Sequence, residues 1–147
     1  MGASVVGHLA WETAHLPLYT LWTEGSPEQI VYAVLHCTGG DLLIALSCLM
    51  GALVLVGNSR WPADRFLPVA GFTMVSGFFY TVFSEWLNVE LRQSWAYAPS
   101  MPTLPPLETG LTPVLQWLVV PSVALAFVRR AERGQGERRR SASVREG

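Results

Sequence analysis

The chain has 147 residues, of which 50% are hydrophobic and only 14% are charged, and its formal net charge is −1. Because soluble globular proteins are usually about one-quarter charged, this composition excludes an ordinary water-soluble domain and indicates a membrane protein. Most of the six tryptophans lie near the ends of apolar runs, where amphipathic rings favour the headgroup region of a bilayer.

The first apolar segment, residues 5–22, is shorter and more polar than those that follow. It contains His8, Glu12 and His15, and Pro17 would kink or end a helix because it lacks a backbone donor. We predict a short fourth helix that runs from the cytoplasm outward with its polar face toward the other helices. A segment that lies on the outer surface is the alternative. The sequence lacks the basic start and continuous apolar core of a signal peptide, so we expect no cleavage.

The same segment carries a weak pattern for metal binding. His8, Glu12 and His15 are spaced by four and three residues, which places them on one face of a helix. A Glu-x-x-His pair is typical of bundle-type di-iron proteins. A second such pair is missing, so we favour no metal site and predict no cofactor.

Three longer apolar runs follow, at residues 30–57, 66–91 and 111–128. At a rise of ~1.5 Å per residue, each approaches or exceeds the ~30 Å hydrocarbon thickness of a bilayer. We therefore predict an all-α membrane helical bundle with three transmembrane helices, plus the shorter one at the amino end.

The arginines give these helices an orientation. Lysine is absent, and seven of the arginines follow residue 128. Cytoplasmic segments are enriched in positive charge, so residues 129–147 are predicted to form a disordered, Arg-rich cytoplasmic tail. The loop 58–65 is then also cytoplasmic, and the loop 92–110 faces the periplasm. The C-terminus is therefore predicted to lie in the cytoplasm.

Each long run carries a strongly polar side chain near the outer boundary of the membrane. Counted from the cytoplasmic ends of their helices, Asp41 lies about 24 Å and Glu85 about 28 Å along the axis. Gln116 lies close to the outer start of the last run. Polar and ionisable groups inside a membrane are costly, which makes Asp41 and Glu85 candidates for function, including catalysis.

Helical spacing groups these residues into faces. Thr81, Glu85, Asn88 and Arg92 are spaced by four, three and four residues, so they share one face. Such a stripe should face protein or water, because lipid offers no hydrogen-bond partner.

A second pattern, of small residues, occurs on the preceding run. Gly40, Ser47 and Gly51 are small enough for another helix to approach closely, and we predict a packing seam along them.

The segment 95–113 is rich in proline and begins with aromatic residues. Its five prolines disfavour helix, so it either lies as a lid over the outer end of the bundle or is an ordinary connector. The predicted ligand pocket is lined by His36, Asp41, Glu85, Asn88, Arg92, Trp95, Tyr97 and Gln116.

Glu85, Trp95 and Tyr97, followed by the proline-rich loop, resemble a segment of the small, three-span bacterial lycopene cyclase subunits. That resemblance implies a proton-donating acid at Glu85 and chemistry on carotenoid ends without net redox change. The chain departs from the family pattern at Gln93, where a glycine is expected.

The chain as a whole is similar to a group of small, uncharacterised proteobacterial multi-pass inner-membrane proteins. This resemblance implies a location in the bacterial inner membrane but no particular activity. It is carried by Trp11-Glu12, Leu16-Pro17-Leu18-Tyr19-Thr20, His36-Cys37-Thr38 and Ser84-Glu85-Trp86-Leu87-Asn88-Val89.

These observations predict a polar pocket near the periplasmic side that binds, or helps to transport, a small polar or amphiphilic ligand. An enzyme of lipid or isoprenoid chemistry would use Glu85 or Asp41 as a proton donor. A structural subunit of a membrane complex would have these groups fully paired. The expected partners are membrane lipids, further copies of the chain or other membrane subunits. No nucleic acid is expected, because the basic residues lack interleaved aromatic residues.

Overall fold

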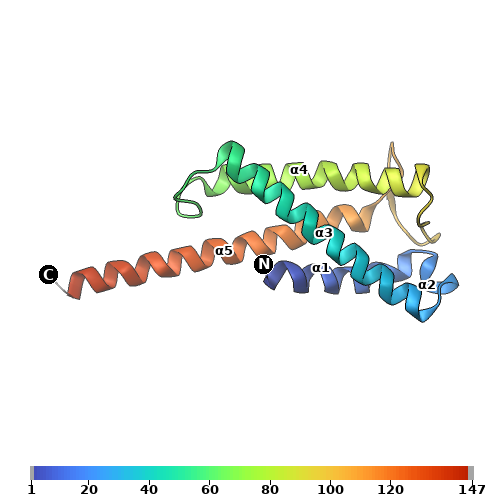
Figure 1. The fold of residues 1–147 in the computed structure, drawn as a ribbon, viewed down its shortest axis with the longest axis horizontal. Coiled ribbons are helices and arrows are strands. Elements are labelled where there is room, and N and C mark those ends of the chain that lie inside the picture. The colour runs from blue at the N-terminus through green and yellow to red at the C-terminus, as the bar shows by residue number, and fades with distance from the viewer. Residues whose placement is uncertain (1, 146–147) are drawn as a thin grey trace.

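The computed structural model describes the backbone of residues 2–145 and the side chains of residues 2–138 and 141. The elements are α1 (Gly2–His15), a 3₁₀ turn (Leu16–Leu18), α2 (Leu21–Glu24), α3 (Pro27–Val56), α4 (Phe66–Trp86), a π-helical turn (Leu87–Leu91), β1 (Thr103–Leu104), β2 (Thr109–Gly110) and α5 (Leu111–Arg145). Helices dominate the structure: α1, α4 and α5 run roughly along one long axis, and α3 crosses them obliquely (Figure 1).

Within the described residues, three helical stretches are long and apolar enough to cross a membrane. They are Pro27–Val56, Phe66–Leu91 and Leu111–Arg138. This confirms the predicted helical bundle with three candidate spans.

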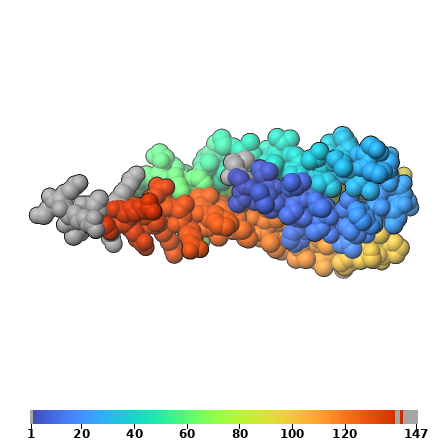
Figure 2. Space-filling view, turned by 90° about the horizontal axis from the view of Figure 1, so that it is seen from below, coloured from blue at the N-terminus to red at the C-terminus, as the bar shows by residue number. Residues whose placement is uncertain are grey.

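The predicted fourth span is not confirmed. α1 has 14 residues, which rise about 21 Å and fall short of the ~30 Å hydrocarbon thickness. It extends from the end of the bundle that carries α2 to about the middle of α5 (Figure 1). There it lies between α3 and α5 (Figure 2). Its helix ends at His15, and Pro17 stands in the 3₁₀ turn that follows.

α3 begins earlier than the apolar run at residue 30, because its first turn is capped. The side chain of Ser26 accepts a hydrogen bond from the backbone N–H of Gln29, and the Gln29 side chain accepts one from the backbone N–H of Ser26. Pro27 occupies a first-turn position, where its missing donor costs nothing.

The structure describes the predicted tail, as far as residue 145, as helix. α5 continues as one helix to Arg145. The residues after 128 include seven arginines, three glutamates and two alanines, and no proline, which is compatible with a helix. Because the preceding span already forms the helix, its continuation needs no new nucleus.

The loop Asn58–Arg65, which joins α3 to α4, is organised around one carboxylate. The Asp64 side chain accepts hydrogen bonds from Asn58 Nδ2 at 2.8 Å and from Arg60 at 3.0 Å. The hydrogen bond from the Asn58 side chain, followed by that from the backbone N–H of Arg65, holds the pKa of Asp64 below its ordinary value.

α4 and α5 approach each other closely at one glycine. The ring of Trp117 occupies the space where a Cβ on Gly77 would stand, and Trp117 is only 1% exposed. A side chain of any size at this position of α4 would displace the ring.

The predicted seam along Gly40, Ser47 and Gly51 does not pack within this chain. No atom of the described residues lies within 4 Å of a Cβ built on Gly40 or Gly51, and Ser47 is exposed. The small residues that do receive a neighbour are elsewhere, at Gly77 and at Gly7, whose built Cβ meets Val120 of α5.

The end of the bundle that carries α2 is covered by irregular chain. Backbone hydrogen bonds of 2.9 Å from Ala98 to Leu18 and of 3.0 Å from Thr20 to Ala96 join the loop 92–110 to the turn after α1. The β1–β2 pair closes the same loop further along. This arrangement places the loop as a cover over the helix ends.

Candidate functional site

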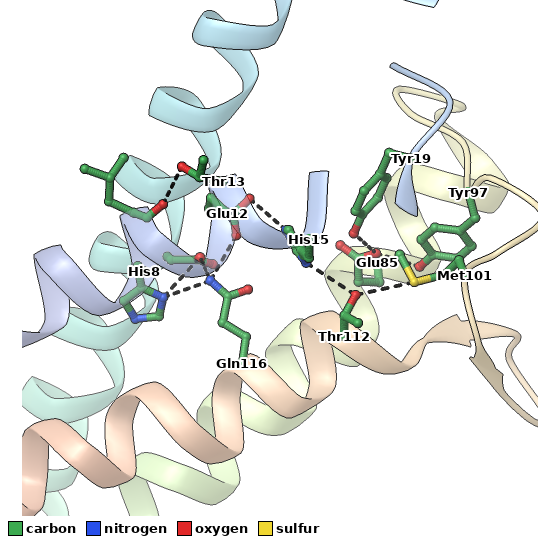
Figure 3. Close-up of polar contacts among 12 residues, drawn as sticks. His8, Glu12, Thr13, His15, Tyr19, Glu85, Tyr97, Met101, Thr112 and Gln116 are labelled. Atoms are coloured by element: carbon green, nitrogen blue, oxygen red, sulfur yellow. Dashed lines mark hydrogen bonds and ion pairs between the residues drawn. The ribbon is translucent and has the colours of Figure 1, made fainter. Parts of the chain in front are cut away.

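Gln116 of α5 is the centre of a buried polar cluster (Figure 3). Its Nε2 lies 2.6 Å from Asp41 Oδ2, 2.9 Å from Glu12 Oε1 and 3.1 Å from His8 Nδ1. These partners come from α3 and α1, so one amide connects three helices. Gln116 is 2% exposed and His8 is fully buried.

The protons of this cluster can be assigned from its geometry. An amide –NH₂ has only two protons to donate, and Asp41 and Glu12 are the acceptors that cannot donate when ionised. His8 Nδ1 also lies 3.2 Å from Asp41 Oδ2. If Gln116 donates to both carboxylates and His8 donates its Nδ1 proton to Asp41, three of the four contacts are hydrogen bonds. The 3.1 Å approach of Gln116 Nε2 to His8 Nδ1 is then a contact between two donors.

The network extends along α1 toward the covered end. His15 Nε2 lies 3.1 Å from Glu12 Oε2, and His15 Nδ1 lies 3.3 Å from Thr112 Oγ1. Glu12 and His15 are each 8% exposed. The prediction that the polar face of this segment points at the other helices is therefore confirmed.

A second cluster surrounds Glu85 of α4. Tyr97 donates to Glu85 Oε2 at 2.6 Å, and Tyr19 approaches the same oxygen at 3.5 Å. The backbone N–H of Gly110 donates to the Tyr97 hydroxyl at 2.9 Å. Burial, followed by the negative charge of Glu85, raises the pKa of both tyrosines. Both phenols therefore remain protonated, and both can donate to the carboxylate.

Sequence reasoning missed Tyr19 as a site residue. It lies in the turn between α1 and α2, within the segment 5–22 that was predicted as a short helix, and its position is fixed by a long-range bridge to Tyr97. A tyrosine four residues after His15 was the available signal, but nothing local indicated that it would reach α4.

A cavity of about 910 Å³ lies between the two clusters and is lined by Asp41 and Glu85 alike. Ligand pockets typically measure ~300–1,000 Å³. Seven of the eight residues predicted for the pocket line it. The eighth, Tyr97, does not line the cavity but donates a hydrogen bond to Glu85. The seven are His36, Asp41, Glu85, Asn88, Arg92, Trp95 and Gln116.

The remaining pocket residues differ in how they are held. Asn88 donates to the backbone oxygen of Ser84 at 2.8 Å, which anchors it to its own helix. His36 is exposed and lies nearly parallel to Tyr32, with ring centroids 5.4 Å apart. Arg92 is exposed and makes no ion pair with any residue that the structure describes.

Two polar atoms in the cavity wall are buried without a hydrogen-bond partner among the described residues. They are Thr81 Oγ1 and Trp95 Nε1. Thr81 is 7% exposed. Six further buried side-chain atoms of the described residues also lack a partner, among them Trp61 Nε1 and Trp117 Nε1, so this pair alone does not identify a ligand.

The weak metal candidates His8, Glu12 and His15 do lie on one face of α1, but each is hydrogen-bonded to protein. Across residues 2–145, no group of three or more His, Cys, Asp or Glu side chains is arranged to hold a metal ion.

Comparison with known proteins gives no relative: no family model, curated protein or solved structure matches the chain.

Proposed function

We propose that the chain is an integral protein of a bacterial inner membrane, with the Arg-rich end of α5 in the cytoplasm. The loop 58–65 and the far end of α5 lie toward the same end of the bundle (Figure 1). Both carry arginine, which favours cytoplasmic segments. The loop 92–110 and the cavity then lie toward the periplasmic side.

We further propose that the cavity binds a small polar or amphiphilic ligand, as a binding protein or as an accessory to transport. The observation that carries this proposal is that one cavity touches both Asp41 and Glu85. If the acids served only to hold the helices together, a closed, fully paired cluster would suffice and no cavity would be needed beside them.

The two acids are arranged as fixed acceptors. Asp41 uses Oδ2, and Glu85 uses Oε2, for the hydrogen bonds that hold them in place. The other oxygen of each carboxylate has no protein donor within the described part of the chain. Carboxylates whose positions are already fixed can bind a ligand without further ordering of the side chains.

A second candidate is acid catalysis on a lipid or isoprenoid, as the resemblance to lycopene cyclase subunits implies. The observation that favours it is the pair of Glu85 and Tyr97, which lies 2.6 Å apart beside a cavity of substrate size. Glu85 would be protonated and would donate its proton to a substrate double bond. The resulting cation would close the ring and lose a proton back to the Glu85 carboxylate, which restores the acid. Conversion of an acyclic carotenoid by the purified protein, abolished by Glu85→Gln, is the outcome that would establish this role.

The binding proposal can be tested without knowing the ligand. The wild-type protein, Asp41→Asn and Glu85→Gln are purified under one mild detergent protocol, and their co-purified lipids and metabolites are compared by mass spectrometry. We expect a species that is enriched in the wild type over the bulk membrane extract and depleted in both variants. Glu90→Gln is the matched control, because Glu90 is exposed and lies outside the cavity wall.

If no species is enriched in the wild type, or if both variants retain it, the binding proposal fails. Thermal unfolding in the same detergent shows whether a variant lost its ligand by losing its fold.

The orientation can be tested by labelling single cysteines. After Cys37 and Cys48 are replaced by alanine, Ser100→Cys should react with a membrane-impermeant maleimide in intact cells, and Ser59→Cys should react only after lysis. The reverse pattern would place the cavity on the cytoplasmic side.

A further inference from the structure

Building on the proposed binding function, we infer that the ligand is an amphiphile whose head carries a primary ammonium and an anionic group. We infer also that it enters sideways from the bilayer, between α3 and α4. The chemical class is that of the aminophospholipids with a free amine.

The charges of the cavity wall favour a cationic group at depth. Glu12, Glu28, Asp41 and Glu85 line the cavity, and Arg92 is the one arginine among the described residues that does. A primary ammonium has three N–H donors, which suit the carboxylate oxygens of Asp41 and Glu85 that no protein group occupies. Charge-assisted hydrogen bonds of this kind are roughly twice as strong as neutral ones.

The cavity wall also contains one further hydrogen-bond acceptor and one donor near the site proposed for the ligand's head group. Thr81 lies one helical turn before Glu85, and its hydroxyl has no hydrogen-bond partner among the described residues. The hydroxyl oxygen lies beneath the cavity surface, so the side chain must rotate to accept a hydrogen bond from the ammonium. Trp95 Nε1 can only donate and lies close to the carboxylate of Glu85; a phosphate or ester oxygen of the ligand would be a further acceptor.

Arg92 provides the place for an anionic group. It follows Glu85 by seven residues, which corresponds to roughly 10 Å along a helix axis toward the covered end. Its guanidinium has no carboxylate partner in the described chain, although four acids line the same cavity. A phosphate at the mouth with an ammonium beneath it satisfies Arg92 and the buried acids together.

The fold blocks the axial route and leaves a lateral one. The loop 92–110 is tied over the helix ends by its backbone hydrogen bonds to the turn after α1. α3 and α4 cross near the loop 58–65 and diverge toward the covered end (Figure 1). On this side the cavity rim consists of large exposed side chains, including Tyr32, Leu43 and Tyr80, which are 66%, 67% and 49% exposed.

In a membrane, this rim faces acyl chains. A tail can therefore stay in the bilayer while the head enters the polar cavity, and no charged group has to cross the hydrocarbon core.

The test compares defined lipids. The full chain is placed in nanodiscs of inert lipid, and the binding of phosphatidylethanolamine, phosphatidylcholine and phosphatidylglycerol is measured by native mass spectrometry. Phosphatidylcholine keeps the charge of the head but has no N–H to donate, and phosphatidylglycerol lacks the cation. We expect phosphatidylethanolamine to bind at least about tenfold more tightly than either.

Three variants locate the binding. Glu85→Gln and Thr81→Val should weaken the preference for phosphatidylethanolamine. Arg92→Gln should weaken the binding of all three lipids, because each carries a phosphate. Glu90→Gln and Arg130→Gln change the same residue types at exposed positions outside the cavity and should leave it intact. Thr81→Val nearly preserves side-chain volume, so it tests the hydroxyl even where a charge variant destabilises the fold.

Equal binding of phosphatidylethanolamine and phosphatidylcholine would overturn the assignment of a hydrogen-bonding ammonium. Glycerophosphoethanolamine has the same head without acyl tails; if it bound as tightly as the lipid, the lateral route would be wrong. Either result would leave the binding proposal standing if the search for co-purified species succeeds. Failure of that search and of every lipid to bind would remove both proposals.

Discussion

The two ends of the bundle are built on different principles. At the end covered by α1 and the loop 92–110, buried ionisable side chains from separate helices meet, and a cavity lies among them. At the other end, α3 and α4 pack through small and apolar residues such as Ala52 and Val69, and the charged pair Arg60–Asp64 is exposed. Three long helices suffice for a dry interface, but the polar interior exists only where α1 is added.

The substitution Gln116→Leu should have the largest effect on stability, because it removes the centre of the polar cluster. The change removes the shared donor of Asp41 and Glu12 and leaves two carboxylates close together in a buried site, which should destabilise the fold by about 3–5 kcal/mol. Unfolding in mixed detergent micelles measures the loss. The matched control is Gln135→Leu, because Gln135 is exposed on the same helix. Equal stability of the two variants would show that the cluster tolerates the loss of its central amide.

Gly77→Ala should have the next largest effect. The added methyl meets the ring of Trp117, and overpacking of this kind costs ~1–3 kcal/mol. Gly71→Ala, on the same helix with open space around it, should be neutral or slightly stabilising. A thermal scan of both variants tests the pair. If they behave alike, the close approach of α4 and α5 is not a constraint on the fold.

Tyr97→Phe should cost about 1–2 kcal/mol, because Glu85 loses its shortest hydrogen bond and the Gly110 N–H loses its acceptor. Tyr80→Phe is the control, because Tyr80 is half exposed and makes no hydrogen bond through its hydroxyl among the described residues. The comparison is again made by unfolding, and by retention of the co-purified species. Loss of that species in the Tyr80 variant alone would place ligand recognition at the rim.

The smallest effect is expected at the opposite end, from Asp64→Asn. The pKa of Asp64 lies below its ordinary value of 3.8 in the folded state, owing first to the hydrogen bond from Asn58. The ionised form is therefore favoured by folding, and this contribution is complete above pH 3.8 and is lost as the pH falls through the lower, folded-state pKa. The stability difference between wild type and variant, followed against pH, should be small and should disappear in acid. A difference that persisted at the lowest pH would need another cause.

The sequence predicted the three candidate spans and the common level of Asp41 and Gln116 along the bundle, because both depend on local composition and on helical rise. Counting along the helices placed Asp41 and Gln116 at one level, and they are hydrogen-bonded at 2.6 Å. The stripe of Thr81, Glu85 and Arg92 lines one cavity, as its spacing indicated.

What the sequence could not predict depends on which surfaces meet. Small residues at Gly40 and Gly51 allow close approach but do not supply a partner, whereas the partner of Gly77 is a tryptophan on a helix that follows in the chain. Tyr19 reaches Glu85 only because the loop after α4 folds back over the turn after α1. Such long-range pairings leave no periodic signal in the local sequence.

The short length of α1 has a consequence for biogenesis. A helix that carries two histidines and a glutamate on one side is a poor substrate for independent insertion into lipid, since nothing there compensates those groups. The polar side chains of α1 can be desolvated only when Asp41 of α3 and Gln116 of α5 are already in place as hydrogen-bond partners. Docking of α1 is then a late event that follows insertion of the long helices, and the cavity is completed only at that final step.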